Sequence, residues 1–157
     1  MGPLVASSIE WAYLAGIIDG EGCVTVNESK PNRKNFSPRF RLVLKITNTS
    51  EHLISWVHER FAGYIYLSHA IGQHKATKNC WTVSWMGGNA EEILKGCFPY
   101  LIVKKYQAEL AFKLREMVGS YSPKGKSFSY KGKPLSEEVI NERRAVLVAL
   151  KVAKRTQ

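Results

Sequence analysis

Cysteine is scarce in this chain, and the few cysteines lie far apart. There are three, Cys23, Cys80 and Cys97, and no two of them form a C-x-x-C pair. This spacing disfavours a zinc ribbon or finger, and separated cysteines in odd number are typical of reduced intracellular thiols. No segment reaches the roughly 18 apolar residues of a membrane-spanning helix, and the first residues lack a secretion signal. We expect an intracellular protein, in a prokaryotic cytoplasm or an organelle.

Aspartate is almost absent, and part of the acidic charge is concentrated at the start. Asp19 is the only aspartate among 13 acidic residues, which face 23 Lys and Arg, so the net charge is +10. The first 23 residues nevertheless hold three acids and no Lys or Arg, a local charge of −3. A basic protein favours a polyanionic partner, which means DNA, RNA or an anionic membrane. No predicted helix combines a basic face with a strongly apolar one, which disfavours the membrane.

Hydrophobic periodicity predicts a single α+β domain over residues 1–157 in the order αββαββα, plus C-terminal helices. The first helix runs from Ile9 to about Asp19, with Ser7 and Glu10 at capping-box spacing. The other expected elements are strands at 23–29, 39–47, 64–69 and 80–85, helices at about 50–61, 89–96 and 100–118, a flexible basic loop at 119–135 and a helix at 136–155. The strands would form one four-stranded antiparallel sheet backed by helices.

Two of these helices carry more specific expectations. Asn89 and Glu92 have the spacing to cap the short helix, and Gly96 is expected to end it. The inner stripe expected of the longer helix comprises Val103, Tyr106, Leu110, Leu114 and Met117.

The alternation in the second strand gives the sheet one apolar and one cationic face. Phe40, Leu42, Leu44 and Ile46 share one face, while the cations of the same strand share the other. A cationic strand face that lies in the DNA major groove can reach base edges, and loop cations are better placed for phosphates. The DNA-contact candidates are Thr25, Asn27, Ser29, Lys30, Arg33, Lys34, Arg39, Arg41, Lys45, Tyr66, Ser68, Lys75, Lys78 and Thr82.

Small residues recur along the first helix. Ala12, Gly16 and Gly20 stand at every fourth position, with Ala15 beside them. Such a stripe lets two helix backbones approach closely. The partner is either another part of the same chain or a second copy of this helix. In the second case two Glu21 carboxylates would come together and would need bridging cations.

The segment Leu14–Gly22, LAGIIDGEG, closely resembles the signature motif of the LAGLIDADG homing endonucleases. Six of its nine positions are identical to the signature, and Glu21 keeps the acid. The predicted order of helices and strands agrees with that family. A single copy of the motif implies a homodimer, whose interface would include Ala12, Ala15, Gly16, Asp19 and Gly20.

The resemblance also implies roles for individual residues. Glu21 would bind divalent cations at the scissile phosphates, with the Gly20 carbonyl as an additional ligand, while Asp19 would be structural. Family members place polar groups after the second strand and a lysine near the later helix. The corresponding catalytic candidates are Asn48, His52 and Lys104.

The leading hypothesis is therefore a Mg²⁺-dependent homing endonuclease. It would act as a homodimer on a long, nearly palindromic double-stranded DNA site, with Mn²⁺ or Ca²⁺ able to occupy the metal sites. The resemblance also implies an intron- or intein-type mobile element as its origin. The alternative is a binding module on the same fold, either an RNA maturase that acts on its host intron RNA or a DNA-binding regulator that does not cleave.

Overall fold

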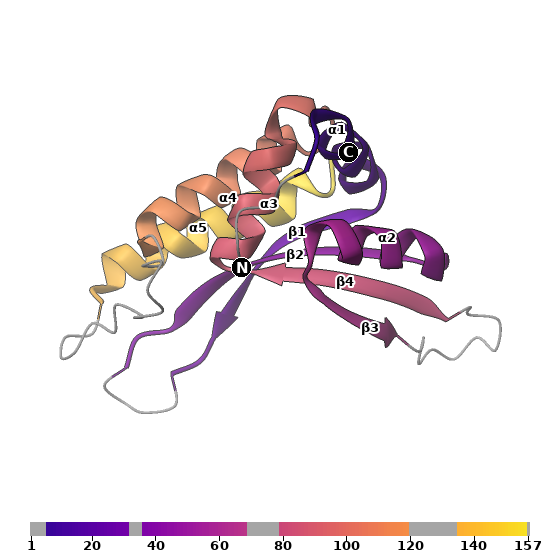
Figure 1. Ribbon diagram of the computed structural model, residues 1–157. Coiled ribbons are helices and arrows are strands. Elements are labelled where there is room, and N and C mark those ends of the chain that lie inside the picture. Colours follow the sequence, from indigo (N-terminus) through magenta and orange to yellow (C-terminus); the bar gives the residue numbers. More distant parts are fainter. Residues whose placement is uncertain (1–5, 32–35, 69–78, 120–134, 157) are drawn as a thin grey trace.

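A computed structural model of the chain describes residues 6–31, 36–68, 79–119 and 135–156 (Figure 1). Its elements are α1 (Ser8–Glu21), β1 (Gly22–Ser29), β2 (Arg39–Asn48), α2 (Glu51–Phe61), β3 (Tyr64–Ser68), β4 (Cys80–Met86), α3 (Gly88–Cys97), a 3-10 turn η1 (Phe98–Tyr100), α4 (Lys105–Val118) and α5 (Glu137–Ala153). The strands form one antiparallel sheet in the order β1-β2-β4-β3. The predicted α+β fold is confirmed. None of the described helices is both long enough and apolar enough to cross a bilayer.

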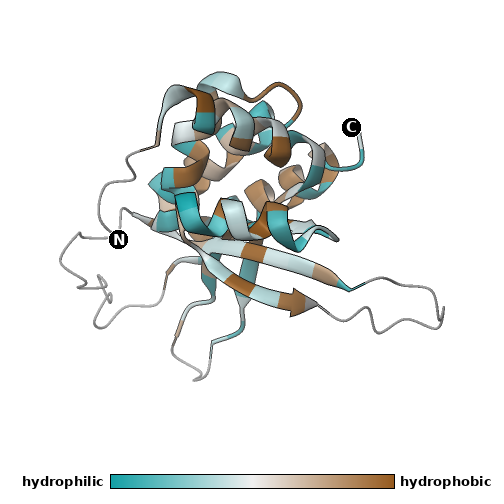
Figure 2. Cartoon of the chain, turned by 45° about the vertical axis from the view of Figure 1, so that its right-hand side comes forward, coloured by the Kyte–Doolittle hydropathy of each residue, from teal (hydrophilic) through white to brown (hydrophobic). Residues whose placement is uncertain are grey.

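The two faces of the sheet have different surroundings. Figures 1 and 2 show the helices gathered on one face, while no described helix covers the other. Val24, Leu42 and Trp85 point toward the helices and are almost fully buried. This is the apolar face that the period-two alternation predicts, because burying it against helices removes it from water.

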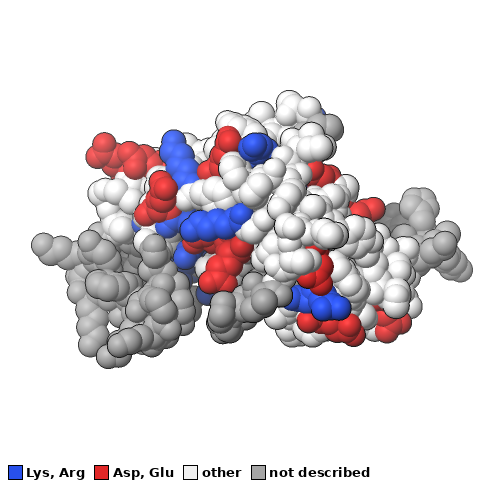
Figure 3. Space-filling view, turned by 45° about the horizontal axis from the view of Figure 1, so that its top comes forward, with Lys and Arg blue, Asp and Glu red and all other residues white. Residues whose placement is uncertain are grey.

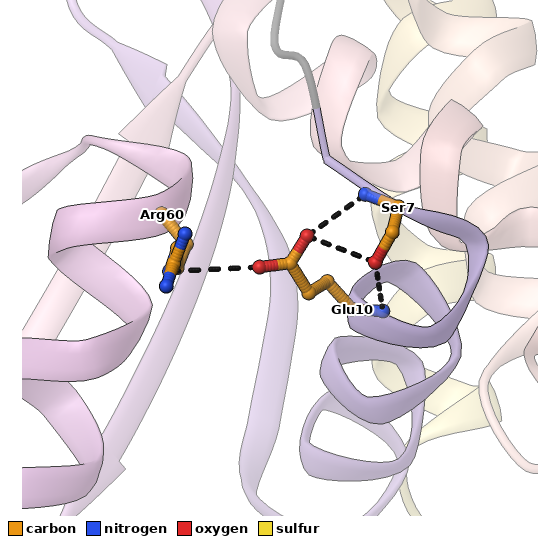
Figure 4. A network of polar contacts seen from close by, with 3 residues as sticks. All are labelled: Ser7, Glu10 and Arg60. Atoms are coloured by element: carbon orange, nitrogen blue, oxygen red, sulfur yellow. Dashed lines mark hydrogen bonds and ion pairs between the residues drawn. The ribbon is translucent and has the colours of Figure 1, made fainter.

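Helix α1 begins with the predicted capping box (Figure 4). The Glu10 carboxylate accepts hydrogen bonds from the Ser7 backbone N–H at 2.8 Å and the Ser7 hydroxyl at 2.9 Å. The Ser7 hydroxyl oxygen in turn accepts from the Glu10 N–H at 3.3 Å. These bonds, together with Arg60 of α2 at 3.5 Å, lower the pKa of Glu10. The start of α1 is thus held mostly by residues adjacent in sequence.

The expected caps of α3 were wrong. Gly87 occupies the N-cap position without a side-chain cap bond, and the helix begins at Gly88 and not at an Asn89 cap. Gly87 has φ +57°, which favours glycine over any residue with a side chain. Gly96 does not end the helix either, because α3 continues to Cys97. A Cβ at Gly96 would lie 2.5 Å from the Trp11 ring, so this glycine provides room for an aromatic side chain of α1.

The buried stripe of α4 also differs from the expected one. The helix begins at Lys105, and Val103 and Tyr106 are exposed. Its buried positions are Gln107, Ala108, Ala111, Leu114 and Arg115. Leu114 is buried as expected, and Leu110 and Met117 pack against the core partly buried. The prediction is wrong only at Val103 and Tyr106, which lie before and at the start of the helix. The predicted end at Gly119 and the Ser136 cap of α5 are confirmed.

Candidate functional site

Helix α1 continues two residues beyond its predicted end and leads directly into β1. Glu21 is its last residue and is exposed, and Gly22 begins the strand. A Cβ at Gly22 would lie 2.5 Å from the Ile18 carbonyl oxygen, so a larger residue would push the strand off the helix end. The tight junction holds Glu21 at the boundary between the helix layer and the sheet.

Asp19, about half a helical turn before Glu21, forms its hydrogen bonds within its own chain. Its carboxylate accepts hydrogen bonds from the backbone N–H groups of Ile102 and Lys104, both at 2.8 Å. The Lys104 ammonium returns a bond to the backbone carbonyl oxygen of Asp19. These contacts fasten the segment before α4 to the end of α1. Asp19 thus has the structural place that was expected of it, and Lys104 is fixed next to Gly20.

A cavity of about 390 Å³ opens beside this junction. Its lining residues are Asp19, Gly20, Gly22, Cys23, Val103, Lys104, Gln107 and Lys154. Lys154 comes from the C-terminal end of α5, and its ammonium lies 3.1 Å from the Cys23 sulfur. The sequence offered no sign of Lys154 at this site, since a cation at the end of a helix has an ordinary role there.

Asn48 and His52 do not line that cavity. The Asn48 side-chain oxygen accepts a hydrogen bond from the Ser50 N–H at 2.8 Å, just before α2. His52 lines a second cavity of about 350 Å³ together with Tyr13, Ser50, Leu53 and Trp56. The structure therefore brings Lys104 to the end of α1 and places the other two predicted catalytic residues around the start of α2.

The small-residue stripe of α1 faces outward. Ala12, Gly16 and Gly20 are exposed, and a Cβ at either glycine would meet no described atom within 4 Å. Ile9 at 78% exposure and Tyr13 at 55% continue the same face. Among the described residues, nothing of the same chain packs on this stripe. Ala15 was wrongly included in the interface, because it is fully buried in the core of its own chain.

The open face of the sheet is cationic, as expected from the alternation. The strand pairing places Asn27 opposite Arg41 and Ser29 opposite Arg39, and these four residues are exposed. Lys45, Thr25 and Tyr66 are partly exposed, and Lys30 is exposed just after β1. No acidic residue lies on this face in the described strands, because Glu28 points to the helix side with Phe40. The helix side, by contrast, carries acids and bases interspersed (Figure 3).

Thr82 is the exception among the predicted DNA contacts. It is only 2% exposed, and its hydroxyl shares a 2.8 Å hydrogen bond with that of Thr47. Its strand is central, and Tyr66 lies opposite it on the edge strand, so Thr82 is covered by its neighbours. Tyr64, which sequence reasoning passed over, is 69% exposed with its ring 5.7 Å from that of Tyr66. Arg33, Lys34, Lys75, Lys78 and the side chain of Ser68 lie outside the described residues.

Comparison with known proteins identifies the family. The LAGLIDADG endonuclease model matches residues 14–114, which is well over half of the chain. The protein therefore belongs to the LAGLIDADG endonuclease family. None of the curated proteins matches it.

Solved structures share the fold at low sequence identity. The homing endonuclease I-CvuI, solved in complex with its target, aligns with a TM-score of 0.68 and 19% identity over 93% of this chain and 82% of that one. The archaeal intron-encoded homing endonuclease I-Vdi141I, complexed with DNA, gives 0.66 and 15% over 92% and 84%. I-TnaI, a further homing endonuclease, gives 0.64 and 14% over 93% and 94%.

Proposed function

We propose that this protein is a site-specific, divalent-metal-dependent DNA endonuclease that acts as a homodimer. The observation that carries the proposal is the position of Glu21. This acid is exposed at the end of α1, between an outward-facing stripe of small residues and the cationic face of the sheet. The small-residue stripe suits a second copy of the chain, and the cationic sheet face suits DNA. Glu21 lies where the partner subunit and the DNA would meet.

The oxygen ligands at this point fit Mg²⁺, although one chain does not supply enough of them. Mg²⁺ prefers oxygen donors, which the Glu21 carboxylate and the Gly20 carbonyl provide. Asp19 adds no free carboxylate, because its oxygens are bonded to Ile102 and Lys104. The described residues hold no group of three or more His, Cys, Asp or Glu side chains that suits a metal. Two copies of Glu21 and the DNA phosphates would complete the coordination.

A bound divalent ion would activate a water molecule and stabilise the leaving oxygen of the phosphodiester. The chain's own contribution is to hold charge in place around that phosphodiester. Lys104, fixed on the Asp19 carbonyl, presents a cation beside Gly20, where negative charge develops as the bond breaks. Asn48 and His52 would reach the reaction only from the start of α2. We assign them a role in ordering water.

The homodimer is supported by the surface of α1 and by chain lengths among relatives. Small outward-facing residues allow a second helix to approach closely, and Ile102, which is 85% exposed, extends the apolar area beside the end of α1. This chain covers 94% of I-TnaI but only 44% of the LAGLIDADG meganuclease I-AabMI, which was solved bound to uncleaved DNA. Two copies of a chain of this size would match the larger relative.

DNA recognition is assigned to the open face of the sheet. Arg39, Arg41 and Lys45 present donors suited to guanine, and Asn27 has the amide that pairs with adenine. Residues nearer the loops, such as Lys30, would contact phosphates and fix the position of the protein along the DNA duplex. I-CvuI was solved with DNA in the presence of Ca or Mg, which agrees with a DNA partner and a divalent ion. An intron-type origin and an intracellular location belong to the same proposal.

The experiment that tests the function is cleavage selection from a randomised duplex library with Mg²⁺. A single enriched site of near-palindromic sequence, cut on both strands, is the expected outcome. Enrichment by binding without any cut product would favour the non-cleaving regulator. Splicing of a host intron RNA without DNA cleavage would favour the maturase.

A further inference from the structure

Helix α5 runs alongside β1 and is fastened to it at two points. Arg144 donates hydrogen bonds to the Glu28 carboxylate at 3.0 and 2.7 Å. At the other end the Lys154 ammonium lies 3.1 Å from the Cys23 sulfur. The helix rises about 15 Å between Arg144 and Lys154, and the strand about 17 Å between Glu28 and Cys23. The two spans match, so α5 runs alongside β1. The later helix residue contacts the earlier strand residue, so the two elements are antiparallel (Figure 1), and the last turn of α5 is held beside the start of the strand.

This arrangement delivers a second cation to the cavity at the end of α1. Lys104 and Lys154 both line it, as do Gly20 and Gly22 on either side of Glu21. Lys104 donates to a backbone carbonyl, which is a strong acceptor, whereas Lys154 contacts a thiol, which is a weak one. No carboxylate of the described residues forms a salt bridge with Lys154. Its ammonium is therefore placed by α5 but is not neutralised by a partner acid.

We propose that Lys154 contacts a DNA phosphate at this same site, so that the C-terminal helix contributes to the active site. The inference rests on the proposed function and adds to it a second, sequence-distant phosphate ligand. An ammonium has three donors, and exchanging a weak thiol contact for a charge-assisted bond to a phosphate oxygen is favourable. Lys154 lines the same cavity as Gly20 and Gly22, the two residues that flank Glu21 in sequence, so α5 adds its cation at the end of α1 that carries the proposed metal ligand.

Lys151 offers a matched control, because it lies three residues earlier on α5 and is exposed. It carries the same charge on the same helix, and it does not line the cavity. A general electrostatic effect of the basic C-terminal segment would appear equally in both positions. A specific phosphate contact would appear only at Lys154.

The experiment compares wild type, Lys154→Met, Lys154→Arg and Lys151→Met in the full-length protein. The DNA is the selected target duplex, bound over a range of salt concentrations. Each phosphate contact contributes about 0.9 to the slope of log binding constant against log salt. Lys154→Met is expected to lower the slope by about that amount per subunit, while Lys154→Arg and Lys151→Met retain it. Single-turnover cleavage by Lys154→Met, with saturating protein, should fall about 10²-fold.

An unchanged slope for Lys154→Met, or an equal change for Lys151→Met, would overturn the proposal. A changed slope with an unchanged cleavage rate would overturn the placement next to the scissile phosphate. Should Lys154→Met lose its fold by circular dichroism, Cys23→Ala takes its place, since it removes the contact that anchors the ammonium. Its slope and cleavage rate are then expected to fall part of the way, and wild-type values would refute the assignment. Wild-type protein that binds DNA without cutting would refute the endonuclease but leave the slope comparison decisive for Lys154.

Discussion

The two ends of α1 are built in different ways. The N-terminal end is satisfied by neighbours in sequence, through the reciprocal bonds of Ser7 and Glu10, and within the described part of the chain Arg60 is its one distant polar partner. The C-terminal end relies on residues more than eighty positions away, because Asp19 bonds to Ile102 and Lys104. Only there does an acid, Glu21, remain exposed and outside the salt bridges of the described residues. One end thus serves stability alone, and the other is organised around an available carboxylate.

Removing the Glu21 charge should have the largest effect on activity. Glu21→Gln is expected to abolish cleavage, a loss beyond the roughly 10²–10³-fold that follows removal of one transition-state contact. DNA binding should persist, because the cations of the sheet face are untouched. Cleavage gels and binding isotherms on one target measure both properties, with exposed Glu109→Gln as the control. Wild-type cutting by Glu21→Gln would remove the metal-binding assignment.

Filling the stripe of α1 should separate assembly from folding. A Cβ at Gly16 meets no described atom of its own chain within 4 Å, so Gly16→Leu has room to begin its side chain outward, and leucine is a better helix former than glycine by up to about 1 kcal/mol. The monomer should keep its fold while the dimer dissociates. Analytical ultracentrifugation checks the mass, with Ala145→Leu on the exposed face of α5 as the matched control. A dimer that survives Gly16→Leu would place the interface elsewhere.

Alanine substitution should lower the free energy of unfolding at Asp19 but not at Glu21. Asp19→Ala leaves two backbone N–H groups without their acceptor, a loss of about 2–3 kcal/mol in the free energy of unfolding. Glu21→Ala should leave the free energy of unfolding almost unchanged, since its side chain is exposed. Urea unfolding at equal protein concentration measures the difference. Equal destabilisation by both substitutions would contradict the division of roles.

Loss of the N-terminal cap is expected to destabilise the protein less than loss of the Asp19 carboxylate. Ser7→Ala removes the hydroxyl that bonds with Glu10 and should cost about 1 kcal/mol in the free energy of unfolding. Cleavage at saturating DNA should not change, because this end lies far along α1 from Glu21. Thermal melting and single-turnover cleavage are the two measurements. A variant that melts normally but cuts slowly would show that the two ends are coupled.

The smallest expected effect is a pH dependence at the same cap. The bonds from Ser7 lower the pKa of Glu10 in the folded protein. Its stabilising contribution is therefore present above the pKa of the unfolded chain and is lost as the pH falls through the folded pKa. Wild type should melt above Glu10→Gln at neutral pH, and the two should converge in acid. Melting curves across this range test it, and a gap that widens in acid would reverse the assignment.

Local patterns predicted much of the fold and only part of the site. The caps at Ser7 and Ser136 and the strand alternation were readable, because they depend on residues a few positions apart. Gly96 was misread, because what it accommodates is the Trp11 ring from a helix far away in sequence. Ala15 was misread for a similar reason, since the same run of small residues borders both the core and the surface. The periodicity of a helix or strand predicts which residues share a face, but it does not predict which other part of the molecule packs on that face.

The family motif, the acid at its end and the cationic outer face of β2 could all be predicted from the sequence alone. These follow from residue identity and from the fixed periods of helix and strand. The packing of the folded chain was needed to show three further features: Asp19 is bonded to Ile102 and Lys104, Thr82 is covered, and Lys154 lines the cavity beside Gly20 and Gly22. Each of these depends on how α4, α5 and the strands pack together. Such long-range contacts follow from the burial of many side chains at once and leave no short pattern in the chain.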